Sequence, residues 1–325
     1  MTAVAEAPTT EFSNQPFSFS EILAPSSDTG DKQDTTESVK VLASDGVELS
    51  IRIYKPPPST PQKEIALLFY HGGGAYSGGG YQYLAKGLSE QYGITVYLPD
   101  LRGHGDSGGA RGDAPSKEQV WRDIDTAVEF VANKHKQQQN KSAGKIYLGG
   151  HSSGGGLVVN YATERNDNNN KSGMIEGYVL ASPELGYMSG TARPNRKEFA
   201  RVNIFAFIAN GIFGILGHNK AVRFNYPVEL LQQDKGLVGF NTVNMANAIT
   251  PETPKEQMAS MCTSDDSKPV GLWVGSGDEL FDANKVADFV PDTDHNTGTV
   301  LPGKNHLGIL VDIHEKIGPW ITRQK

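Results

Sequence analysis

The chain has 325 residues, of which 37% are hydrophobic and 21% are charged, and its formal net charge is −7. This composition is typical of a globular protein, and the length fits one large domain with an insertion. Nucleic-acid-binding proteins usually carry a clustered basic surface, so the acidic charge argues against nucleic acid as a partner. The single cysteine, Cys262, excludes an internal disulfide framework and a cysteine-rich metal site.

The first residues differ in composition from the rest. Residues 1–36 are rich in Thr, Ser, Asp, Glu and Pro, with too few apolar residues to offset the entropy cost of ordering them. We expect a mobile N-terminal arm here, followed by one folded domain over residues 37–325. The start of the chain has neither the basic leader nor the continuous apolar core of a secretory signal, which predicts a cytoplasmic protein.

From residue 37 onward, short apolar segments alternate with amphipathic ones. Two strand-like segments flank Asp45 and Gly46, a pattern typical of a hairpin. Ser116 and Gln119 fit a capping box before a long helix. Strands separated by helices imply a mostly parallel α/β sheet with helices on both faces. The pattern predicts buried strands at 65–70, 94–100, 145–150, 178–183, 270–275 and 299–303, and helices at 83–92, 117–135 and 153–163.

The segment GHSSG at residues 150–154 matches the GxSxG motif of a nucleophilic serine. It follows a predicted strand and opens a predicted helix, and such a sharp turn requires small residues on both sides of the serine. This context predicts that Ser152 presents its hydroxyl at the carboxyl edge of the sheet. A serine hydroxyl is a weak nucleophile at neutral pH and needs a base that a carboxylate orients.

Four histidines follow Ser152, and in hydrolases built on this turn the order is serine, acid, histidine. His306 comes shortly after the predicted strand 299–303, where a catalytic base is expected. His295 precedes that strand, at the opposite edge, and we expect His314 to lie in solvent on the final helix. The remaining histidine, His218, falls in a segment without a matching motif.

An acid is expected after the strand 270–275, where the sequence reads GSGDELFD. Asp278 stands three residues past that strand and has the placement of an orienting carboxylate. Asp282, one turn later, is the alternative. Either aspartate could instead cap a helix, which is a common role for Asp directly after a strand.

The segment HGGGAYSGGG at residues 71–80 follows a central strand and carries almost no side chains. Glycine allows the backbone to approach a substrate closely, so these N–H groups could stabilise a developing oxyanion. Gly73 is the expected donor, with Gly72 or Gly74 as alternatives, and Ser153 supplies the second N–H. A phosphate cradle is disfavoured because no GK[ST] follows. Residues 78–80 could form a turn or open space for substrate.

Together the motifs HGGG, LRGHGDS, GHSSGG, GSGD and NHLGIL resemble those of the α/β-hydrolase fold. The resemblance covers residues 38–325 and is closest to the branch of monoglyceride lipases, lysophospholipases and S33-type serine aminopeptidases. It implies that the site comprises the nucleophile Ser152, the acid Asp278, the base His306 and the oxyanion donors Gly73 and Ser153. It also implies that Asp100, Arg102 and His104 hold the neighbouring loop.

In this fold a helical cap is inserted about where residues 187–265 lie. The most apolar segment of the chain, residues 199–217, falls within it and is too short and interrupted to span a membrane. Its side chains could line an acyl pocket, touch a lipid surface, or bury the cap against the sheet. The residues expected at the pocket are Phe205, Ile208, Ile212 and Phe213.

The function that these features predict is hydrolysis of a carboxylic ester such as a monoacylglycerol or lysophospholipid, through an acyl-enzyme on Ser152. The same fold also hosts thioesterases, lactone-acting enzymes and peptidases, so these are alternatives. A non-catalytic ligand-binding homologue is a third. Because the triad supplies nucleophile, base and electrostatics, no metal and no organic cofactor is expected.

Overall fold

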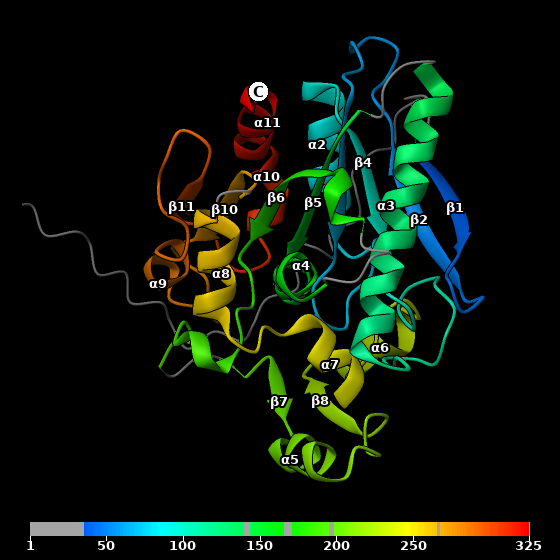
Figure 1. Cartoon of the computed structure of the whole chain (residues 1–325), viewed down its shortest axis with the longest axis vertical. Coiled ribbons are helices and arrows are strands. Elements are labelled where there is room, and N and C mark those ends of the chain that lie inside the picture. Colours follow the sequence, from blue (N-terminus) through cyan, green and yellow to red (C-terminus); the bar gives the residue numbers. More distant parts are fainter. Residues whose placement is uncertain (1–35, 140–143, 166–170, 195–197, 265–266, 325) are drawn as a thin grey trace, which may run out of the picture.

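A large central sheet runs through the computed structural model, which describes residues 36–139, 144–165, 171–194, 198–264 and 267–324 (Figure 1). Its eight described strands lie in the order β1-β2-β4-β3-β5-β6-β10-β11. Pairing is parallel from β4 to β11, whereas β2 is antiparallel to both β1 and β4. The strands are β1 (Thr36–Leu42), β2 (Glu48–Tyr54), β3 (Ile65–Tyr70), β4 (Thr95–Pro99), β5 (Lys145–His151), β6 (Ile175–Ala181), β10 (Val270–Gly275) and β11 (Thr297–Leu301).

Helices cover both faces of this sheet, and two separate apolar cores show which helix lies on which face (Figure 1). Successive strand residues point to opposite faces, so Leu68 packs in one core and Leu67 in the other. The first core includes residues of α3 (Lys117–Gln139), α4 (Ser153–Glu164), α7 (Val243–Ile249), α8 (Pro254–Thr263) and α9 (Ala283–Ala287). The second includes residues of α2 (Gln82–Tyr92), α10 (Ile309–Asp312) and α11 (His314–Arg323).

A smaller sheet lies between β6 and β10 in the sequence, in the order β7-β8-β9. Its strands are β7 (Ala200–Val202), β8 (Lys220–Phe224) and β9 (Phe240–Thr242), and it is accompanied by α5 (Ile204–Phe213) and α6 (Val228–Gln233). The cap segment thus contains a three-stranded antiparallel sheet in addition to helices. In Figure 1, α5 lies at the lower end of the molecule, beside β7 and β8 and away from the central sheet.

The two C-terminal helices of this segment belong to the main core. Met245 and Ile249 of α7 and Met258 of α8 are buried in the same cluster as α3 and α4. The cap segment therefore has two parts: α7 and α8, which cover the central sheet, and the region from β7 to β9, which extends away from it.

Three local features, the first hairpin, the start of β6 and the start of α3, show how far the sequence patterns match the structure. The hairpin around Asp45 and Gly46 is confirmed, with β1 and β2 antiparallel. Strand β6 begins at Ile175, three residues earlier than predicted, because its pairing with β5 starts at Ile175, opposite Ile146. The capping box is half formed: Ser116 accepts the N–H of Gln119 at 3.2 Å, whereas the Gln119 side chain bonds Ser44 and Asp123.

The prediction for His314 was wrong. This side chain is 8% exposed and contacts Gln91 of α2 at 3.1 Å, because α11 packs directly against α2. A Cβ on Gly87 of α2 would lie 2.2 Å from the His314 ring, so glycine at that position makes the close approach possible. The predicted N-terminal arm lies outside the described residues, apart from Thr36, which begins β1. Among the described helices, none combines the length and the apolar composition needed to cross a membrane.

Candidate active site

Ser152 lies in a strained turn between β5 and α4. Its φ of 52° and ψ of −122° place a non-glycine residue in a region that L-amino acids rarely adopt. The flanking glycines are required by contact: a Cβ on Gly150 would lie 2.3 Å from the Gly154 carbonyl, and one on Gly154 would lie 2.4 Å from the Tyr70 carbonyl. The strand-to-helix turn that the sequence predicted is thus present, and it holds Ser152 at the carboxyl end of β5.

His306 and Asp278 form a buried pair, with Nδ1 of the ring 2.8 Å from Oδ2 of the carboxylate. The other oxygen of Asp278 accepts the N–H groups of Leu280 at 2.9 Å and Phe281 at 3.0 Å. Burial by itself would raise the pKa of Asp278, but the His306 ring and the two N–H donors outweigh it and lower that pKa. The carboxylate therefore stays ionised and can fix the orientation of the ring.

The structure also separates the two aspartate alternatives. Asp282 is the N-cap of α9 and accepts the N–H of Lys285, so it performs the helix-capping role. Glu279 accepts the backbone N–H of His306 at 2.9 Å and holds the loop that carries the histidine. Two other histidines are excluded from the pair, since His295 precedes β11 and His218 contacts Asp113.

A chain of hydrogen bonds connects the loops around Ser152. The N–H of Gly72 donates to Tyr81 Oη at 2.7 Å, and Tyr81 Oη lies 3.1 Å from His151 Nδ1. His151 Nε2 lies 2.9 Å from the carbonyl of His306, which can only accept, so this ring is protonated at Nε2 and accepts from Tyr81. Burial, followed by the nearby His306 ring, lowers the pKa of His151 to about 3, so the ring is neutral near pH 7.

Tyr81 had no signal in the sequence, and its position explains the second glycine cluster, residues 78–80. The N–H of Gly79 donates to the Tyr76 carbonyl and that of Gly80 to the Gly78 carbonyl, which forms a tight turn before α2. Gly80 has a φ of +92°, which favours glycine. This turn brings Tyr81 back to within hydrogen-bond distance of Gly72.

The first glycine cluster, residues 72–74, has some backbone groups that form hydrogen bonds and others that do not within the described residues. The Gly72 N–H already donates to Tyr81, so the prediction of Gly72 as an alternative oxyanion donor was wrong. The Gly72 carbonyl accepts from His71 Nδ1 at 2.9 Å, and the Gly73 carbonyl accepts from Tyr226 Oη at 3.0 Å. Within the described residues, the N–H groups of Gly73, Gly74 and Ser153 donate to no other group.

Aromatic residues of the cap segment cover this glycine cluster. A Cβ on Gly73 would lie 2.7 Å from the ring of Phe224, so no larger residue fits there. Phe199 packs against Phe224 and Tyr226, with ring centroids 5.6 and 5.4 Å apart. No motif marks these residues in the sequence, and their spacing from residue 73 gives no signal of the contact.

The four residues expected at an acyl pocket are not enclosed. Their exposed fractions are 82% for Phe205, 54% for Ile208, 69% for Ile212 and 65% for Phe213. The prediction that these residues line an enclosed pocket was therefore wrong. The alternative, in which they bury the cap against the sheet, was wrong as well. These side chains form an exposed apolar face on α5, because β7 and β8 hold this helix away from the central sheet.

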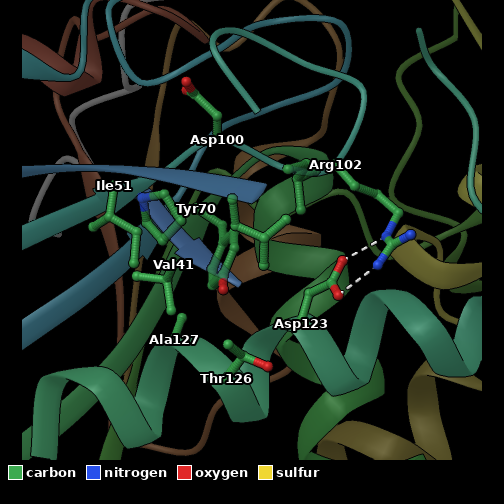
Figure 2. Close-up of a pocket in the computed structure, with 11 residues that line it drawn as sticks. Val41, Ile51, Tyr70, Asp100, Arg102, Asp123, Thr126 and Ala127 are labelled. Carbon is green, nitrogen blue, oxygen red and sulfur yellow. Dashed lines mark hydrogen bonds and ion pairs between the residues drawn. The ribbon is translucent and has the colours of Figure 1, made fainter. Parts of the chain in front are cut away.

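The LRGHGDS segment forms a buried polar network beside the glycine cluster. Arg102 donates to Asp123 at 2.6 and 2.7 Å and to Asp45 at 2.9 and 3.2 Å, and Figure 2 shows Asp100 pointing away from this pair. Asp100 instead accepts the N–H of Ser77, which lies in the glycine-rich segment. The cavity lined by these residues has a volume of about 10 Å³, room for about one water molecule, so it is no substrate site.

Comparisons with known proteins identify the family of this chain. The family model described as serine aminopeptidase, S33, matches residues 61–308. An uncharacterised abhydrolase domain-containing protein of Dictyostelium discoideum is 33% identical over 46% of the chain. A monoacylglycerol lipase of Mycolicibacterium smegmatis is 30% identical over 42% of the chain. The matched regions span 14% and 43% of those two relatives.

Solved structures show the same fold at low sequence identity. A soluble variant of monoglyceride lipase from Saccharomyces cerevisiae, in complex with a substrate analogue, has a TM-score of 0.66 at 17% identity, covering 90% of this chain and 97% of that one. The monoacylglycerol lipase of Paleococcus ferrophilus has a TM-score of 0.58 at 22% identity, covering 86% and 100%. The chain therefore belongs to the S33 serine aminopeptidase family and has the α/β-hydrolase fold.

Proposed function

We propose that this protein is a serine hydrolase that cleaves carboxylic esters through an acyl-enzyme on Ser152. The observation that carries the proposal is the buried pair of Asp278 and His306, whose side chains lie 2.8 Å apart. The loop of His306 is joined by a hydrogen bond to His151, which directly precedes the strained Ser152. In this arrangement His306 removes the proton from Ser152 as its oxygen bonds to the acyl carbon. The ring then gives that proton to the departing alcohol, and water later releases the acid by the reverse sequence.

The oxyanion that forms on the substrate carbonyl needs aimed N–H donors. We assign this role to Gly73 and Ser153, whose N–H groups donate to no other group in the described part of the chain. Each such donor is worth roughly 3 to 4 kcal/mol of transition-state stabilisation. Gly74, whose N–H likewise has no acceptor among the described residues, stays the alternative to Gly73.

The substrate we propose is a medium- or long-chain acyl ester, such as a monoacylglycerol or lysophospholipid. Its support is the likeness to proteins named monoglyceride and monoacylglycerol lipases and the apolar rings of Phe224 and Phe199 beside Gly73. A second candidate is cleavage of an amide, which the family description as a serine aminopeptidase favours. Nitrophenyl esters from acetyl to oleoyl and an aminoacyl nitroanilide separate the two, and an ester rate that peaks at acetyl contradicts the proposed chain length.

A fluorophosphonate probe tests the nucleophile directly. Wild-type protein should form an adduct on Ser152, and Ser152→Ala should abolish it and lower kcat by at least about 10³-fold with unchanged folding. Ser89→Ala is the control, since its hydroxyl contacts the Lys86 carbonyl within α2. Retained turnover in Ser152→Ala, or an adduct elsewhere, contradicts the assignment.

We also propose that the exposed face of α5 contacts a lipid surface. Besides the four apolar residues above, Ile204 and Ile215 are 64% and 79% exposed. Arg201 and Arg223 are partners in the β7–β8 register, on the strands that precede and follow α5; Arg201 forms an ion pair with Glu198 at 2.8 Å, and Arg223 is exposed. A partly apolar helix flanked by basic residues favours contact with anionic lipid.

Sedimentation with phosphatidylcholine vesicles containing phosphatidylglycerol tests this contact. The double variant Phe205→Ser and Ile212→Ser should lose most of the vesicle-bound fraction. Tyr187→Ser is the matched control, because Tyr187 is 92% exposed but lies outside α5. Equal binding of the double variant and the wild type contradicts the proposal.

A further inference from the structure

Two groups of the cap segment donate hydrogen bonds to carbonyls of the first glycine cluster. Tyr226 Oη, which follows β8, donates to the Gly73 carbonyl at 3.0 Å. The backbone N–H of Val238, which precedes β9, donates to the Gly74 carbonyl at 2.8 Å. The cap therefore contacts the backbone of this loop by polar bonds, in addition to the aromatic rings that cover it.

These bonds restrict where the neighbouring N–H groups can point. A trans peptide is planar, with its carbonyl and N–H on opposite sides, so a held carbonyl fixes the N–H of the next residue. His71 holds the Gly72 carbonyl and thereby the Gly73 N–H, while Tyr226 holds the following peptide. With both peptides fixed, the dihedral angles of Gly73 have little freedom. Glycine otherwise loses more conformational freedom on ordering than any other residue.

The hydroxyl of Tyr226 is itself held in position. The residue is 8% exposed, and its ring packs edge-on against Phe199 and Phe224, with centroids 5.4 and 6.2 Å apart. Burial raises the pKa of Tyr226 far above its usual range, so the hydroxyl keeps its proton and remains a donor at all ordinary pH values. Phe224 also contacts the position where a Cβ on Gly73 or Gly74 would lie.

We propose that Tyr226 is a positioning residue through which the cap holds the oxyanion loop in its active geometry. This inference rests on the proposed function, because it assumes that the Gly73 N–H meets the oxyanion. It assigns the cap a part in the chemical step as well as in substrate binding. Loss of the Tyr226 hydroxyl therefore affects the transition state more than the bound ester.

The variant Tyr226→Phe removes this hydroxyl and keeps the packed ring. We expect kcat to fall about 10- to 100-fold, with KM within about two-fold of wild type, because the lost contact frees the peptide that follows Gly73, the residue whose N–H we assign to the oxyanion. The inhibition constant of an alkyl trifluoromethyl ketone, which forms a tetrahedral oxyanion on the serine, should rise by a similar factor. A purely structural role for Tyr226 would not produce this parallel change.

Tyr76→Phe is the matched control. Its hydroxyl donates to Asp234 at 2.9 Å, so it also joins the glycine-rich segment to the cap but touches no carbonyl of the first cluster. Its kcat and inhibitor affinity should stay within about two-fold of wild type. An equal loss in both variants contradicts the inference, as does an unchanged kcat in Tyr226→Phe.

Hydrogen exchange of the peptide containing residues 71–75 separates failure of this inference from failure of the proposed function. Exchange should be faster in Tyr226→Phe than in wild type and unchanged in Tyr76→Phe, whether or not the protein cleaves esters. If wild type has no ester turnover but shows this pattern, the proposed function fails and the cap still holds the loop. If exchange is equal in all three proteins, the inference is wrong.

Discussion

The loops of the central sheet and the cap segment contribute to the candidate site in different ways. Ser152, Asp278 and His306 stand at the carboxyl ends of β5, β10 and β11, where parallel strands bring their loops together. Phe224 and Tyr226 reach the same site from a small separate sheet, by packing against Gly73. The groups that would react are thus placed by strand geometry, and those that cover them are placed by side-chain contacts.

The cap segment itself contains the same contrast on a smaller scale. Helices α7 and α8 are part of the main core, so their apolar residues are buried. Helix α5 has the most apolar sequence and yet most of its large side chains are exposed. Apolar composition alone therefore does not distinguish a helix that packs in the core from one that is exposed. The exposed helix is the one for which we propose contact with a lipid surface.

The largest expected effect tests the geometry of the strand ends. Asp278→Asn should lower kcat by about 10⁴-fold, because a neutral amide no longer stabilises the protonated ring or its orientation. Asp282→Asn, four residues later, should remain within about three-fold of wild type, since this side chain caps α9. Ester hydrolysis at saturating substrate measures both. Similar losses in the two variants would contradict the assignment of the acid.

Acid should destabilise the folded protein through three buried histidines at the ends of the central strands. Burial lowers the pKa of His71 to about 4, and that of His104 and His151 to about 3. Below pH 6.5 the unfolded chain binds protons that these folded rings do not, so the free energy of unfolding falls as pH falls toward about 4. The slope is about 1.4 kcal/mol per pH unit for each ring that titrates.

Urea unfolding at a series of pH values measures this slope. Three rings together give about 4 kcal/mol per pH unit near pH 5. In the variant His104→Gln the slope of the free energy of unfolding against pH should be smaller by about 1.4 kcal/mol per pH unit, the contribution of one ring, whatever the stability of the variant at pH 7. A pH-independent free energy of unfolding between pH 7 and pH 4.5 would show that these histidines are not buried in the neutral form.

A smaller effect tests the contact between the two regions. Gly73→Ala places a Cβ 2.7 Å from the Phe224 ring and should lower kcat about 10- to 100-fold by displacing the loop. Adding Phe224→Ala should restore part of this loss, because it removes the clash. Gly211→Ala in α5, where a Cβ meets nothing within 4 Å, should leave kcat unchanged. No recovery in the double variant would show that the cap ring is not the obstacle.

The smallest effect is expected at the exposed helix. Ile212→Ala should change the free energy of unfolding by less than about 0.5 kcal/mol, since its side chain is 69% exposed. Leu148→Ala, in the fully buried strand β5, should cost about 2 to 5 kcal/mol. Chemical denaturation of both variants measures the difference. A cost above 1 kcal/mol at Ile212 would mean that α5 packs against the molecule in solution.

Much of the sheet region was predictable, because its signals are local. Six apolar segments and their intervening helices predicted a mostly parallel α/β sheet, and the spacing of GHSSG predicted the sharp turn at the serine. The choice of Asp278 over Asp282 followed from distance past a strand. Tyr81 was not predictable, since its role depends on a turn at Gly79 and Gly80 that folds it back onto Gly72.

Sequence patterns were sufficient for the fold class and the serine turn, because each depends on residues close together in the chain. Asp278 and His306 were chosen by their positions after predicted strands and by the order of groups in hydrolases with this turn. Tertiary structure decided which N–H groups of the glycine cluster stay free, and that Tyr226 and Val238 hold its carbonyls. It also decided that α5 faces outward while His314 is buried. The bond between Gly72 and Tyr81 spans nine residues but needs the turn at Gly79 and Gly80. The contacts of Tyr226 and Val238 join segments more than 100 residues apart. The positions of α5 and His314 depend on how the helices pack, so no short-range pattern predicts them.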